Sequence, residues 1–299
     1  MRVGIVGLGR MGSAMAERLL DKDVPITVWN RSPERGRRLL DRGATLATSP
    51  RALTGAVDVV LTSLTDAAAL ASVYGGSDGL LAAPPAGLLL IDCSTVRPTT
   101  MIDLADRATV LGARFLECPV GGSVGPARSG QLLGFAGGGA ADLAAARPLL
   151  DLLCRRIVHA GKVGAGSSLK LAVNLPLLVY WQALGEAFAL CRSVELSPAE
   201  LVDVLTDTSG APPALKGRAA MVAAALGGDV VPGTTFDVDS IRKDLRTMLE
   251  EGHALDTALP LAAQALAVYD TASAAGLGAQ DGAALPAYWA RRAANGAPL

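Results

Sequence analysis

The sequence has almost no net charge and few of the residues that build metal sites or disulfide frameworks. Its 299 residues include 27 lysines and arginines, 28 acidic residues, two histidines and four cysteines. The balanced charge removes the electrostatic basis for binding nucleic acid or a membrane surface. The cysteines form no CxxC pair and no cluster with the histidines, so no metal site is predicted. We interpret all four as small buried apolar residues in a reducing compartment: Cys93, Cys118, Cys154 and Cys191.

Long apolar runs are also missing. Polar residues or proline interrupt the most apolar stretch, residues 169–191, which indicates a buried helix and not a membrane span. No secretory segment precedes the first predicted strand, which begins at Arg2, so we expect a cytoplasmic protein. The length allows a large core and one or two domains.

Short apolar runs alternate with helical patterns up to about residue 160. The predicted strands are 2–6, 26–29, 57–61, 88–92, 114–117, 132–136 and 156–159, with helices at 13–20, 98–111 and 140–153. After Gly166 the pattern becomes helical, at 167–194, 198–207, 213–226, 240–251 and 259–275. This order predicts an α/β fold, with an N-terminal Rossmann doubly wound sheet (1–162) followed by an all-α C-terminal domain (163–299).

A GxGxxG turn follows the first predicted strand directly. It consists of Gly7, Leu8, Gly9, Arg10, Met11 and Gly12. The first glycine allows a tight turn, the second lets a pyrophosphate approach the backbone, and the third lets the next helix pack on its strand. The phosphates would lie at the positive end of that helix. Because a strand precedes the turn and a helix follows it, the motif predicts a dinucleotide site.

The second predicted strand ends in Asn30, Arg31 and Ser32, where an NAD site would place a carboxylate for the two ribose hydroxyls. Arg31 can lie over the adenine and pair with a 2′-phosphate, to which Ser32 can donate, and Arg35 lies one turn further along. These residues favour NADP(H) as the cofactor. They also fit an ordinary helix start, with Ser32 as N-cap, Pro33 at the first helical position and solvated arginines.

Lys170 and Asn174 lie four residues apart in a largely apolar helical pattern, and so share one helix face. Burying both groups is costly unless they face a polar cleft, which could be an active site. The alternative is a lysine that extends to water beside a hydrogen-bonded core asparagine.

Five ordered motifs resemble the β-hydroxyacid dehydrogenases. They are the GxGxxG turn, the segments 92–98 and 117–123, the pattern Gly164-x-Gly166-x-x-x-Lys170-x-x-x-Asn174, and the pair Lys243 and Asp244. That family includes the 3-hydroxyisobutyrate and tartronate semialdehyde dehydrogenases and is related to 6-phosphogluconate dehydrogenase. The resemblance implies hydride transfer between a nicotinamide and a short hydroxy acid or aldehyde acid. It also implies a homodimer or tetramer formed through the helical domain.

The resemblance also implies roles for single residues. Lys170 would be the catalytic acid/base, and Asn174 would hold the substrate oxygen or Lys170 itself. Three residues would contact the nicotinamide side of the cofactor: Leu64, Thr65 and Thr95. Lys243 would reach the cofactor or substrate from the second domain, unless it is only an exposed charge on its helix.

The predicted substrate loop departs from the family pattern. Most members have a serine directly after the Pro-Val pair, where this chain has Gly121, followed by Gly122 and Ser123. We expect Ser123 and the backbone amides of both glycines to bind the substrate, in the manner of the glyoxylate and succinic semialdehyde reductases. In the predicted helix, Pro176 should introduce a kink, and Trp181 either narrows the pocket or packs in the core.

Together these features predict an NADP(H)-dependent oxidoreductase that acts on a small carbonyl compound or hydroxy acid. Two alternatives stay open: an imine reductase of the same architecture, and a cofactor-loaded module without catalysis. Lys170 argues against the first, because imine reductases usually have another residue there. Lys170 and Asn174 together argue against the second. The sequence leaves the substrate, the physiological direction and the oligomer size open.

Overall fold

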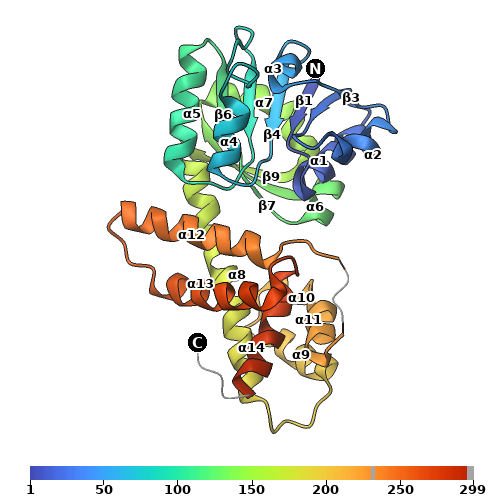
Figure 1. The fold of residues 1–299 in the computed structure, drawn as a ribbon, viewed down its shortest axis with the longest axis vertical. Helices are drawn as coiled ribbons and strands as arrows, with labels where there is room; N and C mark the ends of the chain where they lie inside the picture. Colours follow the sequence, from blue (N-terminus) through green and yellow to red (C-terminus); the bar gives the residue numbers. More distant parts are fainter. Residues whose placement is uncertain (230–232, 295–299) are drawn as a thin grey trace. The chain divides into compact units, whose positions relative to one another are not determined.

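The chain divides into two compact units, Met1–Leu171 and Ala172–Leu299 (Figure 1). The computed structural model describes residues 1–229 and 233–294. The division falls within a long helix, a little later than the boundary at 162/163 that the sequence suggested.

The first unit contains one nine-stranded sheet with the order β3-β2-β1-β4-β5-β6-β8-β7, and β9 pairs with β8. The strands are β1 Val3–Val6, β2 Ile26–Trp29, β3 Thr45–Leu46, β4 Val59–Thr62, β5 Leu89–Asp92, β6 Arg114–Glu117, β7 Val120–Gly121, β8 Leu132–Gly138 and β9 Cys154–Gly161. Strands β1 to β6 pair in parallel, whereas β8 runs antiparallel to β6 and β7. The predicted Rossmann sheet is therefore confirmed.

Helices pack on both faces of this sheet (Figure 1). They are α1 Arg10–Leu20, η1 Pro33–Gly36, α2 Arg37–Leu40, α3 Pro50–Thr54, α4 Ala67–Tyr74, α5 Pro98–Val110, α6 Val124–Ser129 and α7 Ala140–Leu153. Successive strand residues point to opposite faces. Ile5 accordingly joins the core beneath α1 and α7, and its neighbour Val6 joins the core beneath α3, α4 and α5. Burial on both faces explains why these strands read as continuous apolar runs.

The second unit is helical, as predicted. Its helices are α9 Pro198–Thr206, α10 Pro213–Lys216, α11 Ala219–Gly227, α12 Val238–Ala254, α13 Pro260–Ala272, η2 Ser273–Leu277, η3 Gly282–Ala284 and α14 Leu285–Ala294, together with most of α8 Ala165–Leu190. A capping box between Ser197 and Glu200 starts α9. None of the described helices is long and apolar enough to cross a membrane.

Several predicted boundaries were wrong. The first helix begins at Arg10, within the glycine turn, and not at Ser13. The single helix expected at 213–226 is divided into α10 and α11. The break falls at Gly217 and Arg218, where Arg218 leaves helical geometry and its guanidinium packs over Trp181, 5.9 Å from the ring centroid. Trp181 is buried, which agrees with core packing.

The sequence patterns missed the shortest elements, among them β3, β7, α3 and α6. These pieces have two to six residues, too few to show a period. Helix α8 continues through Pro176 to Leu190, and the kink expected at this residue stays a prediction. Cys93, Cys118 and Cys154 are buried in the first unit, as expected. The prediction was wrong for Cys191, which directly follows α8 and is only half-buried.

Candidate functional site

The glycine turn between β1 and α1 has the geometry of a phosphate site. Gly7 has a φ of +92°, and a Cβ there would collide with the carbonyl oxygen of Ser63. A Cβ at Gly12 would collide with the carbonyl oxygen of Gly7. A Cβ at Gly9 would meet no atom within 4 Å, so open space lies where a ligand would approach the backbone. No side chain caps α1, and its first amides fit a pyrophosphate.

Asn30 joins the end of β2 to this turn. Its Oδ1 accepts a hydrogen bond from the Leu8 amide at 2.9 Å, and its Nδ2 donates to the carbonyl oxygen of Ser32 at 3.0 Å. The side chain therefore shapes the loop that would hold the ribose. Arg31 and Arg35 are exposed, and neither has an ion-pair partner within residues 1–229 and 233–294.

The carboxyl ends of four neighbouring parallel strands coincide at one edge of the sheet. Val6, Thr62, Asp92 and Glu117 are the last residues of β1, β4, β5 and β6, and they lie in register. Ligands of open α/β sheets bind outside this edge. The predicted cofactor residues Leu64, Thr65 and Thr95 follow these ends directly.

A buried carboxyl group holds the loops after β4 and β5 together. Asp92 accepts hydrogen bonds from the hydroxyls of Thr62 and Tyr74 and from the amide of Ser94. Ser94 Oγ in turn accepts from the amide of Leu64 at 2.9 Å. Burial raises the pKa of Asp92, and the hydrogen bonds oppose that shift. This network fixes the backbone beside Leu64 and Thr95, and Thr95 itself is half-buried.

The predicted substrate loop contains two glycines in different conformations. Gly121 lies in β7, its φ is not positive, and a Cβ there would face the ring of Phe135 at 3.3 Å. Gly122 has a φ of +125°, which favours glycine. Ser123 is half-buried just before α6, and its hydroxyl does not cap that helix. A serine side chain at position 121 would therefore point toward β8. Within residues 121–123, the side-chain hydroxyl group belongs to Ser123.

Lys170 belongs to the first unit and is only 8% exposed. It lies in α8, shortly after a first turn that is bound to Glu117 at the end of β6. Asn174 follows four residues later on the same helix. Burial of a lysine near the ligand-binding edge agrees with the polar-cleft interpretation better than with a surface position.

In the second unit, Asp244 links Asn174 to Lys243. The Asn174 Nδ2 donates to one carboxylate oxygen at 3.1 Å, and the Lys243 Nζ lies 2.5 Å from the other. Asp244 is 3% exposed, and the Lys243 side chain is 30% exposed. Lys243 is thus a half-buried cation that pairs with a buried carboxylate.

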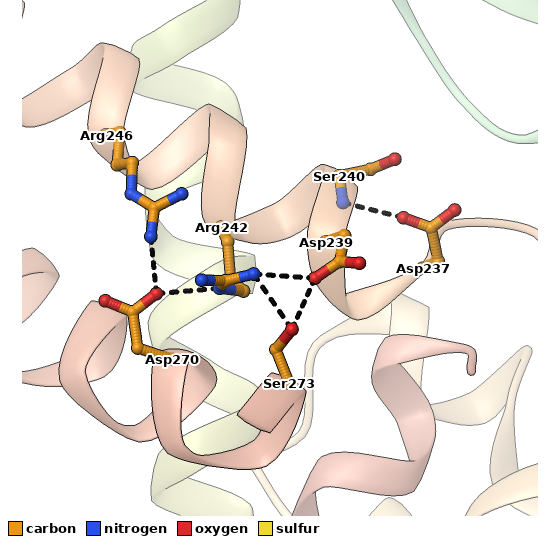
Figure 2. Close-up of polar contacts among 7 residues, drawn as sticks. All are labelled: Asp237, Asp239, Ser240, Arg242, Arg246, Asp270 and Ser273. Atoms are coloured by element: carbon orange, nitrogen blue, oxygen red, sulfur yellow. Dashed lines mark hydrogen bonds and ion pairs between the residues drawn. The ribbon is translucent and has the colours of Figure 1, made fainter. Parts of the chain in front are cut away.

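Helix α12, which carries this pair, is bound to α13 by an ionic network (Figure 2). Asp270 accepts from Arg242 at 2.7 Å and from Arg246 at 2.6 Å. Arg242 also binds Asp239 and Ser273. Because these contacts lie along one side of α12, they fix its rotation about its own axis and hence the direction of Lys243 and Asp244.

Sequence reasoning assigned no role to three acidic residues that organise these groups: Asp92, Glu117 and Asp244. A signal was present for two of them, because an acidic residue that ends an apolar strand must be buried or face the ligand edge. For Asp244 the signal was its place directly after Lys243.

Comparison with known proteins identifies the family. A model of the NAD-binding domain of 6-phosphogluconate dehydrogenase matches residues 2–161, and a model described as the NAD-binding region of NADP-dependent 3-hydroxyisobutyrate dehydrogenase matches residues 164–289. The 3-hydroxyisobutyrate dehydrogenase of Pseudomonas aeruginosa is 36% identical over 88% of this chain and 89% of its own. Glyoxylate/succinic semialdehyde reductase 1 of Arabidopsis thaliana is 33% identical over 94% and 96%.

Solved structures agree. A 3-hydroxyisobutyrate dehydrogenase from Salmonella typhimurium has a TM-score of 0.85 at 30% identity, over 96% of this chain and 99% of that one. A structure described as Psf3 in complex with NADP+ and 2-OPP has a TM-score of 0.86 at 28% identity, with the same coverage. A reductive aminase from Aspergillus terreus, with a TM-score of 0.64 at 23% identity over 96% and 99%, shares the fold.

This chain belongs to the β-hydroxyacid dehydrogenase family. It is an oxidoreductase with a binding domain for a nicotinamide dinucleotide.

The raised pKa of Asp92 predicts a pH dependence of stability. The folded protein holds this proton more tightly than the unfolded chain, whose Asp pKa is near 3.8. The stabilisation is therefore complete below that value and is lost as the pH rises through the folded-state pKa. In urea titrations from pH 4 to pH 7, the stability of the parent relative to Asp92→Asn should fall as the pH rises. The slope for this one proton is at most about 1.4 kcal/mol per pH step of one. A difference that stays constant or grows would contradict the assignment.

A thermodynamic cycle can test the cluster in the second unit. Lys243→Ala, Asp244→Ala and the double variant should give a coupling energy of about 1 to 3 kcal/mol, because removing the lysine takes the cation away from the buried carboxylate of Asp244. The free energy of unfolding is the quantity to measure. The exposed pair Arg147 and Asp151 is the matched control and should give less than about 0.5 kcal/mol. Equal coupling in the two cycles would show that Asp244 does not link Lys243 to this cluster energetically.

Proposed function

We propose that this protein is an NADP(H)-dependent enzyme that interconverts a short hydroxy acid and the corresponding aldehyde or keto acid. The observation that carries the proposal is the buried lysine of α8, Lys170, in a chain whose relatives include 3-hydroxyisobutyrate dehydrogenases and semialdehyde reductases. The glycine turn would hold the pyrophosphate, and the loops after β4 and β5 would hold the nicotinamide end. When bound, the nicotinamide supplies or accepts the hydride.

Lys170 would manage the proton of the reaction. In the direction of reduction, its ammonium donates a hydrogen bond to the substrate carbonyl and delivers the proton to that oxygen. In the direction of oxidation, the neutral amine accepts the hydroxyl proton. Asn174 would orient the substrate oxygen or Lys170, and its own amide is oriented by Asp244. Ser123, with the amides of Gly121 and Gly122, would bind the acid group of the substrate.

The preference for NADP(H) rests on the residues that follow β2. Arg31 and Arg35 are exposed, and Ser32 lies beside them, so a 2′-phosphate would meet two guanidinium groups and a hydroxyl. The description of one matching family model and the ligand named for the Psf3 structure both specify NADP, which supports the proposal.

NADPH should bind more tightly than NADH by about 1.5 to 3 kcal/mol, the range for charge-assisted contacts to a phosphate. Arg31→Ala should remove most of this preference, because it removes the guanidinium nearest the end of β2. Fluorescence titration with both cofactors measures it, and Arg147→Ala, an exposed arginine of α7, is the control. Equal affinities of the parent protein for the two cofactors would rule out the assignment.

Lys170→Ala should lower kcat by about 100-fold to 10,000-fold and change NADPH affinity little, because a positioned acid/base acts in the transition state. The assay is NADPH absorbance with a panel of aldehyde acids, neutral aldehydes, ketones and cyclic imines. Aldehyde acids should be the best substrates of the parent. The exposed Lys22→Ala is the control. If Lys170→Ala kept its rate within a few-fold, or cyclic imines were the best substrates, the proposed function would be wrong.

A further inference from the structure

Glu117 binds the start of α8 through four hydrogen bonds. Its side chain is fully buried at the end of β6. The carboxylate accepts from the amides of Gly164 at 2.5 Å, Gly166 at 2.9 Å and Ser167 at 3.2 Å, and from the Ser167 hydroxyl at 2.5 Å. One strand end is thereby bound to the first turn of the helix that carries Lys170.

The surrounding glycines leave room for this carboxylate. A Cβ at Gly137 of β8 would collide with Glu117 Oε1, and a Cβ at Gly166 would collide with the carbonyl oxygen of Phe135. Gly164 has a φ of +99°, which turns its amide toward the carboxylate at a conformation that favours glycine. The two glycines of the Gly164-x-Gly166 pattern therefore let the start of α8 approach Glu117. This packing role requires no bound ligand.

The charge of Glu117 is stabilised by helix amides. No lysine or arginine forms an ion pair with it in the part of the chain that the structure describes. An anion at a helix N-terminus gains from the orphan amides and from the helix dipole. Burial nevertheless raises the pKa of Glu117, against the effect of the four hydrogen bonds. A costly buried acid thus lies at this junction, where three backbone amides and one hydroxyl need an acceptor.

Lys170 lies three residues after Ser167, so the position and rotation of the first turn set the direction of the lysine side chain. We propose that Glu117 is a positioning residue that holds α8 in register with β6 and so places the Lys170 amine for proton transfer. This inference rests on the role of Lys170 in the proposed function. Glu117 acts through Lys170 and need not touch substrate or cofactor.

The test replaces the carboxylate without changing its size. In Glu117→Gln one acceptor oxygen becomes an amide donor that faces other donors. We expect kcat to fall about 10-fold to 100-fold, as for a reacting group displaced by about 1 Å. The NADPH dissociation constant should change less than about 3-fold, because the four hydrogen bonds that Glu117 accepts come from residues 164–167 and not from the glycine turn. The KM for the best aldehyde acid should change less than kcat. Glu117→Asp keeps the charge and both acceptors, and should retain more of kcat.

Two further measurements separate positioning from general loss of structure. Hydrogen exchange in the amides of residues 164–167 should become faster in Glu117→Gln, whereas exchange in β1 and α1 should stay as in the parent. The primary deuterium isotope effect on kcat with deuterated NADPH should rise, because a misplaced proton donor slows the chemical step. Leu143→Ala, a buried residue of α7, should lower the melting temperature and leave the isotope effect unchanged. The exposed Glu195→Gln should change neither.

Ser167→Ala removes one of the four donors and answers the question if Glu117→Gln does not fold. In this variant kcat, the isotope effect and the exchange rates of residues 164–167 should change in the same direction as in Glu117→Gln, but by less. If both variants exchange faster at 164–167 but keep the parent kcat and isotope effect, Glu117 only caps the helix and the inference is wrong. If Lys170→Ala is inactive while these variants are fully active, only this inference fails. If Lys170→Ala keeps the parent rate, the proposed function fails as well.

Discussion

The site depends on buried carboxyl groups that bind backbone amides at the carboxyl edge of the sheet. Asp92 and Glu117 end neighbouring strands and lie in register with one another. A buried acid is stable only when donors surround it, so each one fixes the segment that supplies those donors. Asp92 holds the loops after β4 and β5 through Ser94, and Glu117 holds the start of α8. The end of the sheet thereby fixes the loops that directly follow β4 and β5. It also fixes the start of α8 through Gly164, which lies 47 residues after Glu117 in the sequence.

The second unit uses a buried acid in the same way. Asp244 is bound by Asn174 and Lys243, two of the residues to which the family resemblance gives functional roles. Its helix is in turn bound to α13 through Asp270, which accepts from Arg242 and Arg246 (Figure 2). In both units the proposed reactive groups are cationic or neutral, and acids that need not touch the substrate orient them. Such supporting groups can affect the rate, because displacing a reacting group by about 1 Å can slow the reaction about 100-fold.

In the proposed function, few residues would specify recognition of the cofactor and of the substrate. The glycine turn provides the geometry for any dinucleotide, whereas discrimination between NADP(H) and NAD(H) would come from the charge that follows β2. The reductive aminase shows that this fold also accommodates a different chemistry. The proposed chemistry of this chain therefore rests on Lys170 and the loop around Ser123, and not on the architecture.

The sequence by itself determined the α/β class, the helical second half and the nucleotide turn, because apolar periodicity and glycine spacing act over a few neighbouring residues. The family motifs also singled out Lys170, Asn174 and Lys243. Only the tertiary structure decided what orients them. Glu117 meets the start of α8 across 47 residues of sequence, and Asn174 meets Asp244 across 70. Such contacts depend on how strands and helices pack, and no local pattern of residue types encodes the partner of a buried acid.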